Sequence, residues 1–128
     1  MADEKQILKA LSELYISIFE FDLHENTLEP YKTNPFIEMW SEGFKTAQDK
    51  TSHVMRNIAK PECVNDLLDF VRVTDLADRM GDQTEISHVF EGLVNGWCKA
   101  RFIVVDRGDD GKPWHVLYTV ETVPEYQN

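Results

Sequence analysis

The chain has 128 residues, 42% of them hydrophobic and 28% charged, a composition typical of a single folded globular domain. A formal net charge of −10 opposes binding to phosphate backbones and to anionic lipid, so we expect no nucleic-acid partner. No apolar run reaches the ~18 residues that a membrane helix needs, and Asp3 and Glu4 stand where a signal peptide would carry positive charge. The sequence therefore predicts a cytoplasmic protein with no membrane partner.

Residues 1–14 predict an N-terminal amphipathic helix. Acidic residues occupy its first turn, where they suit the helix dipole, and Ile7, Leu8, Leu11 and Leu14 fall on one apolar stripe. This stripe could cover the domain's own sheet or pair with a second copy of the chain, and the two arrangements are compatible.

Residues 15–32 predict two strands, Tyr15–Asp22 and Thr27–Lys32, separated by a polar turn. Pro30 places the second strand at a sheet edge, because proline has no amide hydrogen to donate to a neighbouring strand. Alternation divides the first strand into two faces, one with Ser17, Phe19 and Phe21 and the other with Ile16, Ile18, Glu20 and Asp22.

Residues 35–80 change to the spacing of short helices. The first helical group follows a proline and contains Phe36, Ile37, Met39, Trp40 and Phe44. A second helix is expected over Asp49–Ala59, and a third begins at Pro61, which suits a first helical position. Thr74 is the expected N-cap of a last short helix, and Gly81 is its expected end.

Residues 84–123 predict three strands in a meander. Asn95-Gly96 is the strongest short hairpin signal, and a charged turn with Gly108 and Gly111 joins the last two strands. The complete order is a helix, two strands, several helices and three strands. It predicts an α+β fold in which a five-stranded antiparallel sheet carries short helices on one face.

The register of the first hairpin decides which side chains face inward. Counting outward from a two-residue turn at Asn95-Gly96 places His88 opposite Ile103. Glu91 then lies on the inner face with Val89, Leu93, Cys98, Ala100 and Phe102. The outer face would carry Phe90, Val94, Trp97, Ile103 and Val105 together with Lys99 and Arg101. A slip of one residue, or a Glu91 at the sheet edge, remains the alternative, because one slip moves every side chain to the other face.

Cofactor ligands are not evident in the sequence. No two of the histidines and cysteines have the short spacing of a zinc site. His53 is the histidine of the helical segment that could bind haem, but helix histidines are more often packed or solvated. Cys63 lies in Pro-Glu-Cys-Val-Asn, unlike the Asn-Cys-Arg-Phe setting of a flavin photosensor. These observations argue against metal, haem and flavin, and they identify no cofactor.

Several local sequences carry a resemblance to a known family. They are Lys60-Pro61-Glu62-Cys63, Trp97–Phe102, Val104-Val105-Asp106, Gly111-Lys112-Pro113 and His115-Val116-Leu117. The chain resembles PAS-like sensor domains that lie beside diguanylate cyclase or histidine kinase modules in bacterial signalling proteins. The resemblance covers nearly the whole chain and implies a single domain over residues 1–128. It also implies a sheet in which the first strand pairs with the second and the fifth, and a covalently linked or separate cyclase or kinase as effector.

The resemblance implies a non-catalytic sensory domain in bacterial signal transduction. It would bind a small molecule or a partner between the inner sheet face and the helices, and relay the change to an effector through its terminal helices. The candidate pocket residues, assigned by face, are Phe19, Phe21, Trp40, Glu91, Ala100, Phe102, Tyr118 and Val120. A homodimer is expected through the outer face, with Ile7, Leu11, Ile16, Ile18, Trp97 and Ile103. The alternatives are a ligand-free dimerisation scaffold with a packed core, and a small cyclase- or isomerase-type enzyme with Glu91 as general base.

Overall fold

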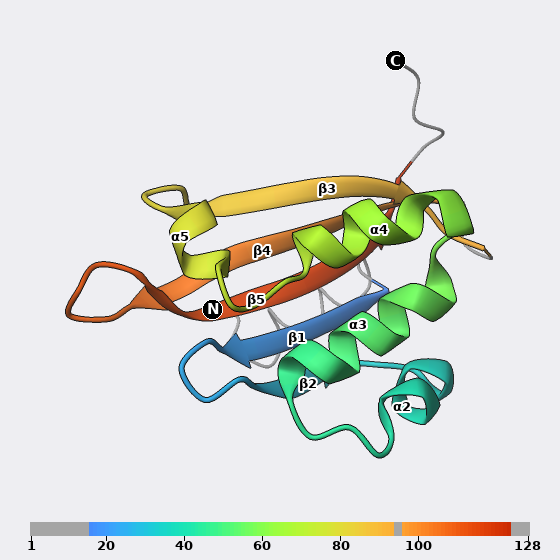
Figure 1. The fold of residues 1–128 in the computed structure, drawn as a ribbon, viewed down its shortest axis with the longest axis horizontal. Helices are drawn as coiled ribbons and strands as arrows, with labels where there is room; N and C mark the ends of the chain where they lie inside the picture. The colour runs from blue at the N-terminus through green and yellow to red at the C-terminus, as the bar shows by residue number, and fades with distance from the viewer. Residues whose placement is uncertain (1–15, 94–95, 124–128) are drawn as a thin grey trace, which may run out of the picture.

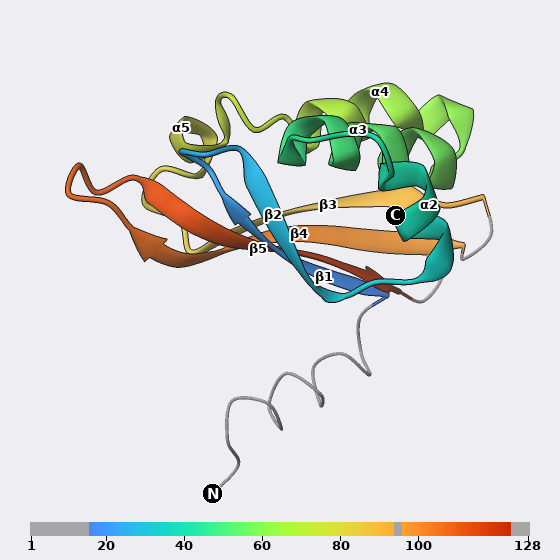
Figure 2. The same cartoon turned by 90° about the horizontal axis from the view of Figure 1, so that it is seen from below.

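The computed structural model describes residues 16–93 and 96–123, so the predicted helix over residues 1–14 lies outside the described residues. A twisted sheet forms one layer, and helices cover one of its faces (Figures 1 and 2). The elements are β1 (Ser17–Asp22), β2 (Thr27–Lys32), α2 (Pro35–Ser41), α3 (Ala47–Ile58), α4 (Pro61–Phe70), α5 (Leu76–Met80), β3 (Glu85–Glu91), β4 (Trp97–Arg107) and β5 (Pro113–Thr122).

The sheet has five strands in the order β2-β1-β5-β4-β3, and every neighbouring pair is antiparallel. This confirms the predicted α+β class and the strand order that the resemblance implied. β1 and β5 are neighbours near the centre of the sheet, with Ser17 opposite Val120. The chain therefore enters β1 and leaves β5 at the same end of the sheet.

Proline residues and side-chain caps explain where the helices begin. Pro35 and Pro61 begin α2 and α4, where a missing amide hydrogen costs nothing. Thr46 caps α3 by accepting a hydrogen bond from the backbone N–H of Asp49 at 3.1 Å. The prediction for the last helix was wrong by one residue at its start. The residue before its first turn is Asp75, not Thr74.

An aromatic cluster forms the centre of the core between the sheet and the helices. The ring of Phe102 lies 5.7 Å from that of Phe21 and 4.7 Å from that of Tyr118, between centroids. All three rings are fully buried. Helices α4 and α5 contribute Leu67, Leu76 and Met80, which are fully buried too. All six side chains belong to one buried hydrophobic cluster.

The predicted register of β3 was wrong. His88 pairs with Ala100, three residues along from the predicted Ile103, and Glu91 pairs with Trp97. The hairpin does not close with two residues, because β3 already ends at Glu91 and the loop begins at Gly92. The backbone N–H of Gly92 donates to the carbonyl of Gly96 at 2.7 Å, which closes this longer loop.

Contacts with the end of α3 explain why β3 ends early. Leu93 donates its backbone N–H to Ile58 O at 2.8 Å, and Gly92 forms an isolated bridge with Ala59. A Cβ on Gly92 would lie 3.3 Å from the carbonyl oxygens of both Gly96 and Ile58, which is tighter than a usual contact, so glycine suits this close approach. A tertiary contact, not local turn propensity, therefore decides the register.

The odd shift in register exchanges the two faces of β3. Phe90, predicted on the outer face, is buried in the core opposite Cys98. Val89, predicted inside, belongs to the other face with its partner Lys99. The assignments for β4 were correct: Cys98, Ala100 and Phe102 are buried, whereas Lys99 and Arg101 are only partly covered.

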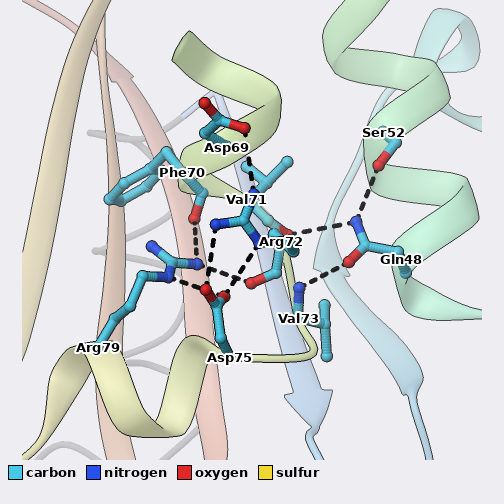
Figure 3. Close-up of polar contacts among 9 residues, drawn as sticks. All are labelled: Gln48, Ser52, Asp69, Phe70, Val71, Arg72, Val73, Asp75 and Arg79. Carbon is cyan, nitrogen blue, oxygen red and sulfur yellow. Dashed lines mark hydrogen bonds and ion pairs between the residues drawn. The ribbon is translucent and has the colours of Figure 1, made fainter. Parts of the chain in front are cut away.

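A polar network holds the segment between α4 and α5 (Figure 3). The side-chain oxygen of Gln48, on α3, accepts from the backbone N–H of Val73 at 2.6 Å, and its amide donates to Ser52 Oγ at 2.8 Å. Arg79 donates to the carbonyl oxygens of Phe70 and Arg72 at 2.9 and 2.7 Å. The connection between these helices is thereby fixed on both sides by side chains.

Candidate functional site

A small apolar cavity lies between the sheet and helices α2 and α3. Its volume is about 30 Å³, and it is partly open to solvent. The lining residues are Ser17, Phe19, Leu28, Ile37, Ser41, Lys50, Thr51, Val54, Met55 and Tyr118. The hydroxyl group of Tyr118 donates to Met55 Sδ at 3.2 Å, which joins β5 to α3 across the cavity wall. Burial raises the pKa of this phenol far above its usual range.

The predicted pocket residues divide into those that line the cavity and those that do not. Phe19 and Tyr118 line it. Phe21, Ala100, Phe102 and Val120 lie on the same inner face, but they are buried in the solid part of the core. Trp40, on α2, packs against the core from its edge and is outside the cavity wall. The cavity thus lies nearer to β2 and α2 than the position predicted from the alternation of side chains along the strands.

Glu91 does not belong to the pocket, and this prediction was wrong. Because β3 ends at Glu91 in the shifted register, its side chain leaves the inner face that holds Phe90. Its Oε2 lies 2.6 Å from Nζ of Lys60, in an ion pair at the edge of the sheet. The hydrogen bond to Glu91 raises the pKa of Lys60. The hypothesis of Glu91 as a general base required an inward-facing carboxylate, so it loses its support.

Four polar residues of the cavity were not identified from the sequence: Ser17, Ser41, Lys50 and Thr51. Lys50 and Thr51 are one turn into α3, and Val54 follows Lys50 and Thr51 at the helical spacings that share a face. The apolar spacing of α3 was recognised, but a lysine next to such a stripe is usually solvated. Lys50 lies at a cavity only because α2 and β1 pack against α3.

The predicted outer-face residues are partly supported by the structure. Trp97 and Ile103 alternate with buried residues of β4 and so face away from the helices. Ile18 lies on that face and is only 2% exposed. Ile16 precedes β1, is partly buried and packs against the core cluster. Ile7, Leu11 and Val94 lie outside the described residues.

A second polar cluster lies at the opposite end of β1 and β5. His115 Nδ1 is 2.9 Å from both carboxylate oxygens of Asp106, and its Nε2 is 3.4 Å from Oδ2 of Asp22. The hydrogen bond to Asp106 raises the pKa of His115, and the same bond lowers the pKa of Asp106. Trp114 Nε1 donates to Asp22 at 3.1 Å, and its indole stacks on His24 at 4.1 Å between ring centroids. The cluster fastens the β1–β2 turn to the start of β5.

The histidine and cysteines that the sequence analysis weighed as cofactor ligands lie in separate parts of the fold. His53, on α3, contacts the ring of Phe44 at 4.8 Å between centroids. Cys63 and Cys98 are free thiols, and burial raises the pKa of Cys98 to about 11. Over residues 16–93 and 96–123, no three His, Cys, Asp or Glu side chains are grouped to hold a metal ion. No helix in this described part is long and apolar enough to cross a membrane.

Comparison with solved structures identifies the architecture. The chain is similar to a domain of a protein from Haloarcula marismortui described as a light and redox sensing histidine kinase. The superposition covers 94% of this chain and 100% of that domain, with a TM-score of 0.50 and 14% sequence identity. The fold is PAS-like. At this identity, the PAS-like likeness concerns the backbone alone. No protein-family model matches the sequence, and a search of curated proteins gives no match.

Proposed function

We propose that this chain is a non-catalytic sensory domain of a signal-transduction protein. In this proposal, its PAS-like fold binds a small molecule in the cavity between β1, β5 and helices α2 and α3. The observation that carries the proposal is the cavity itself. It is an apolar space, partly open to solvent, whose wall includes residues of the buried hydrophobic cluster.

The position of the cavity supports a relay to an effector. Ser17 lines the cavity, and it is the first residue of β1. Ile16, just before it, donates its backbone N–H to Val120 O at 2.6 Å. A ligand that moves Ser17 would therefore act directly on the place where the chain enters β1 and leaves β5. In this proposal, the segments beyond that point transmit the change to a cyclase or kinase, linked or separate, by a shift in population.

Native mass spectrometry tests the ligand. We expect the freshly purified chain, kept concentrated and measured before dialysis so that a weakly bound ligand is retained, to carry extra mass that disappears on denaturation. Val54→Leu, which adds a methylene group inside a cavity of about 30 Å³, should abolish the extra mass. Val89→Leu, on the opposite sheet face, is the matched control and should retain it. Extra mass that both variants keep would place the ligand elsewhere, and a chain without extra mass would contradict a tightly bound ligand.

A ligand-free dimerisation scaffold is the second candidate, and the small cavity volume favours it. A volume of about 30 Å³ is far below the several hundred Å³ of pockets for drug-sized ligands. The outer face offers a surface for a homodimer, since Ile103 and Val105 share it and Val105 is 51% exposed. Ile103→Lys tests this interface by sedimentation. We expect the wild type to sediment as a dimer and the variant as a monomer, and a monomeric wild type would refute the interface.

A further inference from the structure

One basic residue, Lys50, lines the cavity. It is the fourth residue of α3 and is only partly exposed. In the part of the chain that the structure describes, its ammonium group has no carboxylate within ion-pair distance. Other lysines near the core differ: Lys60, for example, pairs with Glu91 at 2.6 Å. Among the residues that the structure describes, this cation next to an apolar cavity therefore has no counter-ion, in a chain of net charge −10.

Two largely buried residues with hydroxyl groups lie in the same wall. Ser17 is 2% exposed and Thr51 is 6% exposed. Neither hydroxyl makes a hydrogen bond to another described residue, whereas that of Ser41 donates to Glu38 O at 3.1 Å. Among the described residues, the hydroxyls that are buried without a partner are those of Thr33 and Thr119, so Ser17 and Thr51 do not carry that cost. At the cavity wall they instead offer hydrogen-bonding groups to a ligand that has oxygen atoms.

The volume of the cavity limits the apolar part of such a ligand. A dry protein cavity that holds benzene measures about 150 Å³. The cavity here is about 30 Å³, which leaves room for a methyl-sized group next to Val54 and Met55 but excludes an aromatic ring.

We propose that the ligand is a short-chain monocarboxylate of about two to four carbon atoms. Its alkyl end occupies the cavity against Val54, and its carboxylate accepts hydrogen bonds from Lys50 and Thr51. A charge-assisted bond at a partly buried site gives the selectivity for an anion over a neutral molecule of equal shape. This inference rests on the proposed sensory function and names the ligand class of the same cavity.

Titration of the ¹⁵N-labelled chain followed by NMR tests the ligand class. The probes are sodium propionate, propionamide as a neutral isostere, and sodium chloride at equal ionic strength. We expect propionate to give saturable shifts at the amides of Phe19 and Thr51, with an affinity no tighter than micromolar because the ligand has few atoms. Propionamide should bind at least about tenfold more weakly. Chloride should leave these amides unchanged.

Two lysine variants locate the anion. Lys50→Met keeps the length of the side chain and removes its charge, and we expect at least about a tenfold loss of propionate affinity. Lys45→Met is the matched control, since Lys45 is exposed and is not part of the cavity wall. It should bind propionate as the wild type does. If the spectrum of Lys50→Met is not that of a folded chain, Lys50→Gln replaces it.

The possible results distinguish a failure of the carboxylate ligand class from a failure of the proposed sensory function. Equal binding of propionate and propionamide at the cavity would overturn the carboxylate class and leave the sensory cavity standing. Equal losses in the Lys50 and Lys45 variants would overturn the role of Lys50. If no probe shifts the cavity amides and the purified chain carries no extra mass, both the ligand class and the sensory cavity fail.

Discussion

The ammonium group of Lys60 lies 2.6 Å from Glu91 Oε2 and connects the residue before α4 to the last residue of β3. Lys60 also donates its backbone N–H to the carbonyl of Glu91 at 2.9 Å. Side chain and backbone thus act together at the point where the β3–β4 loop meets the end of α3. This contact occurs in the observed register, in which Glu91 pairs with Trp97 and does not lie on the inner face.

We expect the ion pair to couple the stability of the two residues. Lys60→Met and Glu91→Gln should each lower the midpoint of urea unfolding, and the double variant should lose less than the sum of the two. The physical reason is that either single change leaves one partly covered charge without its partner. The effect is expected to be small, since both side chains remain about one-third exposed to water. Strictly additive losses would show that the pair contributes nothing.

The cluster around His115 should make stability depend on pH. Since the pKa of His115 in the folded chain is raised above 6.5, its contribution is complete below that pH and is lost as pH rises through the raised value. The pKa of Asp106 is lowered from 3.8, so its contribution is present above that pH and is lost as pH falls below it. The two contributions coexist between these limits.

Thermal unfolding of His115→Gln against the wild type measures this dependence. The difference in Tm should be largest between about pH 4.5 and pH 6 and should shrink toward about pH 9. His53→Gln is a suitable control, because His53 packs on Phe44 and contacts no carboxylate among the described residues. A difference that is constant over this range would contradict the proposed coupling of His115 with Asp106.

Removal of Gln48 should loosen the segment between α4 and α5. Gln48→Ala leaves the backbone N–H of Val73 without an acceptor in a buried position, which should cost about 1–3 kcal/mol of unfolding free energy. Hydrogen exchange of that amide should accelerate as well. Ser52→Ala removes only the hydroxyl that accepts from Gln48, and should change stability by less than about 0.5 kcal/mol. Unaltered exchange at Val73 in the Gln48 variant would show that the bond is not needed.

The hydroxyl of Tyr118 should be dispensable for folding. It is fully buried and donates to a thioether sulfur, which is a weak acceptor. Tyr118→Phe should therefore stay within about 1 kcal/mol of the wild type. Tyr118→Ala should lose about 3–5 kcal/mol, because it removes a ring that packs on Phe21 and Phe102. Chemical denaturation measures both, and a large loss in the phenylalanine variant would give the hydroxyl a structural role.

Local patterns were sufficient for the class of fold and for most elements. Thr27–Lys32 forms a strand with the predicted bounds, and Pro61 starts a helix as expected. The alternation of Cys98, Ala100 and Phe102 gave their inward face correctly. These features depend on the period of side chains along one element and on the special backbone of proline, which a sequence contains in full.

The site depended on contacts between elements that are distant in the chain. The Asn95-Gly96 signal was outweighed by the bonds of Gly92 and Leu93 to the end of α3, so Glu91 moved from the predicted pocket to an ion pair with Lys60. Lys50 became a cavity residue only because β1 and α2 pack against α3. The sequence by itself determined which segments become strands and helices, because their periodicity is local. The tertiary structure decided the register and the cavity, because both arise from packing between segments that no local period describes.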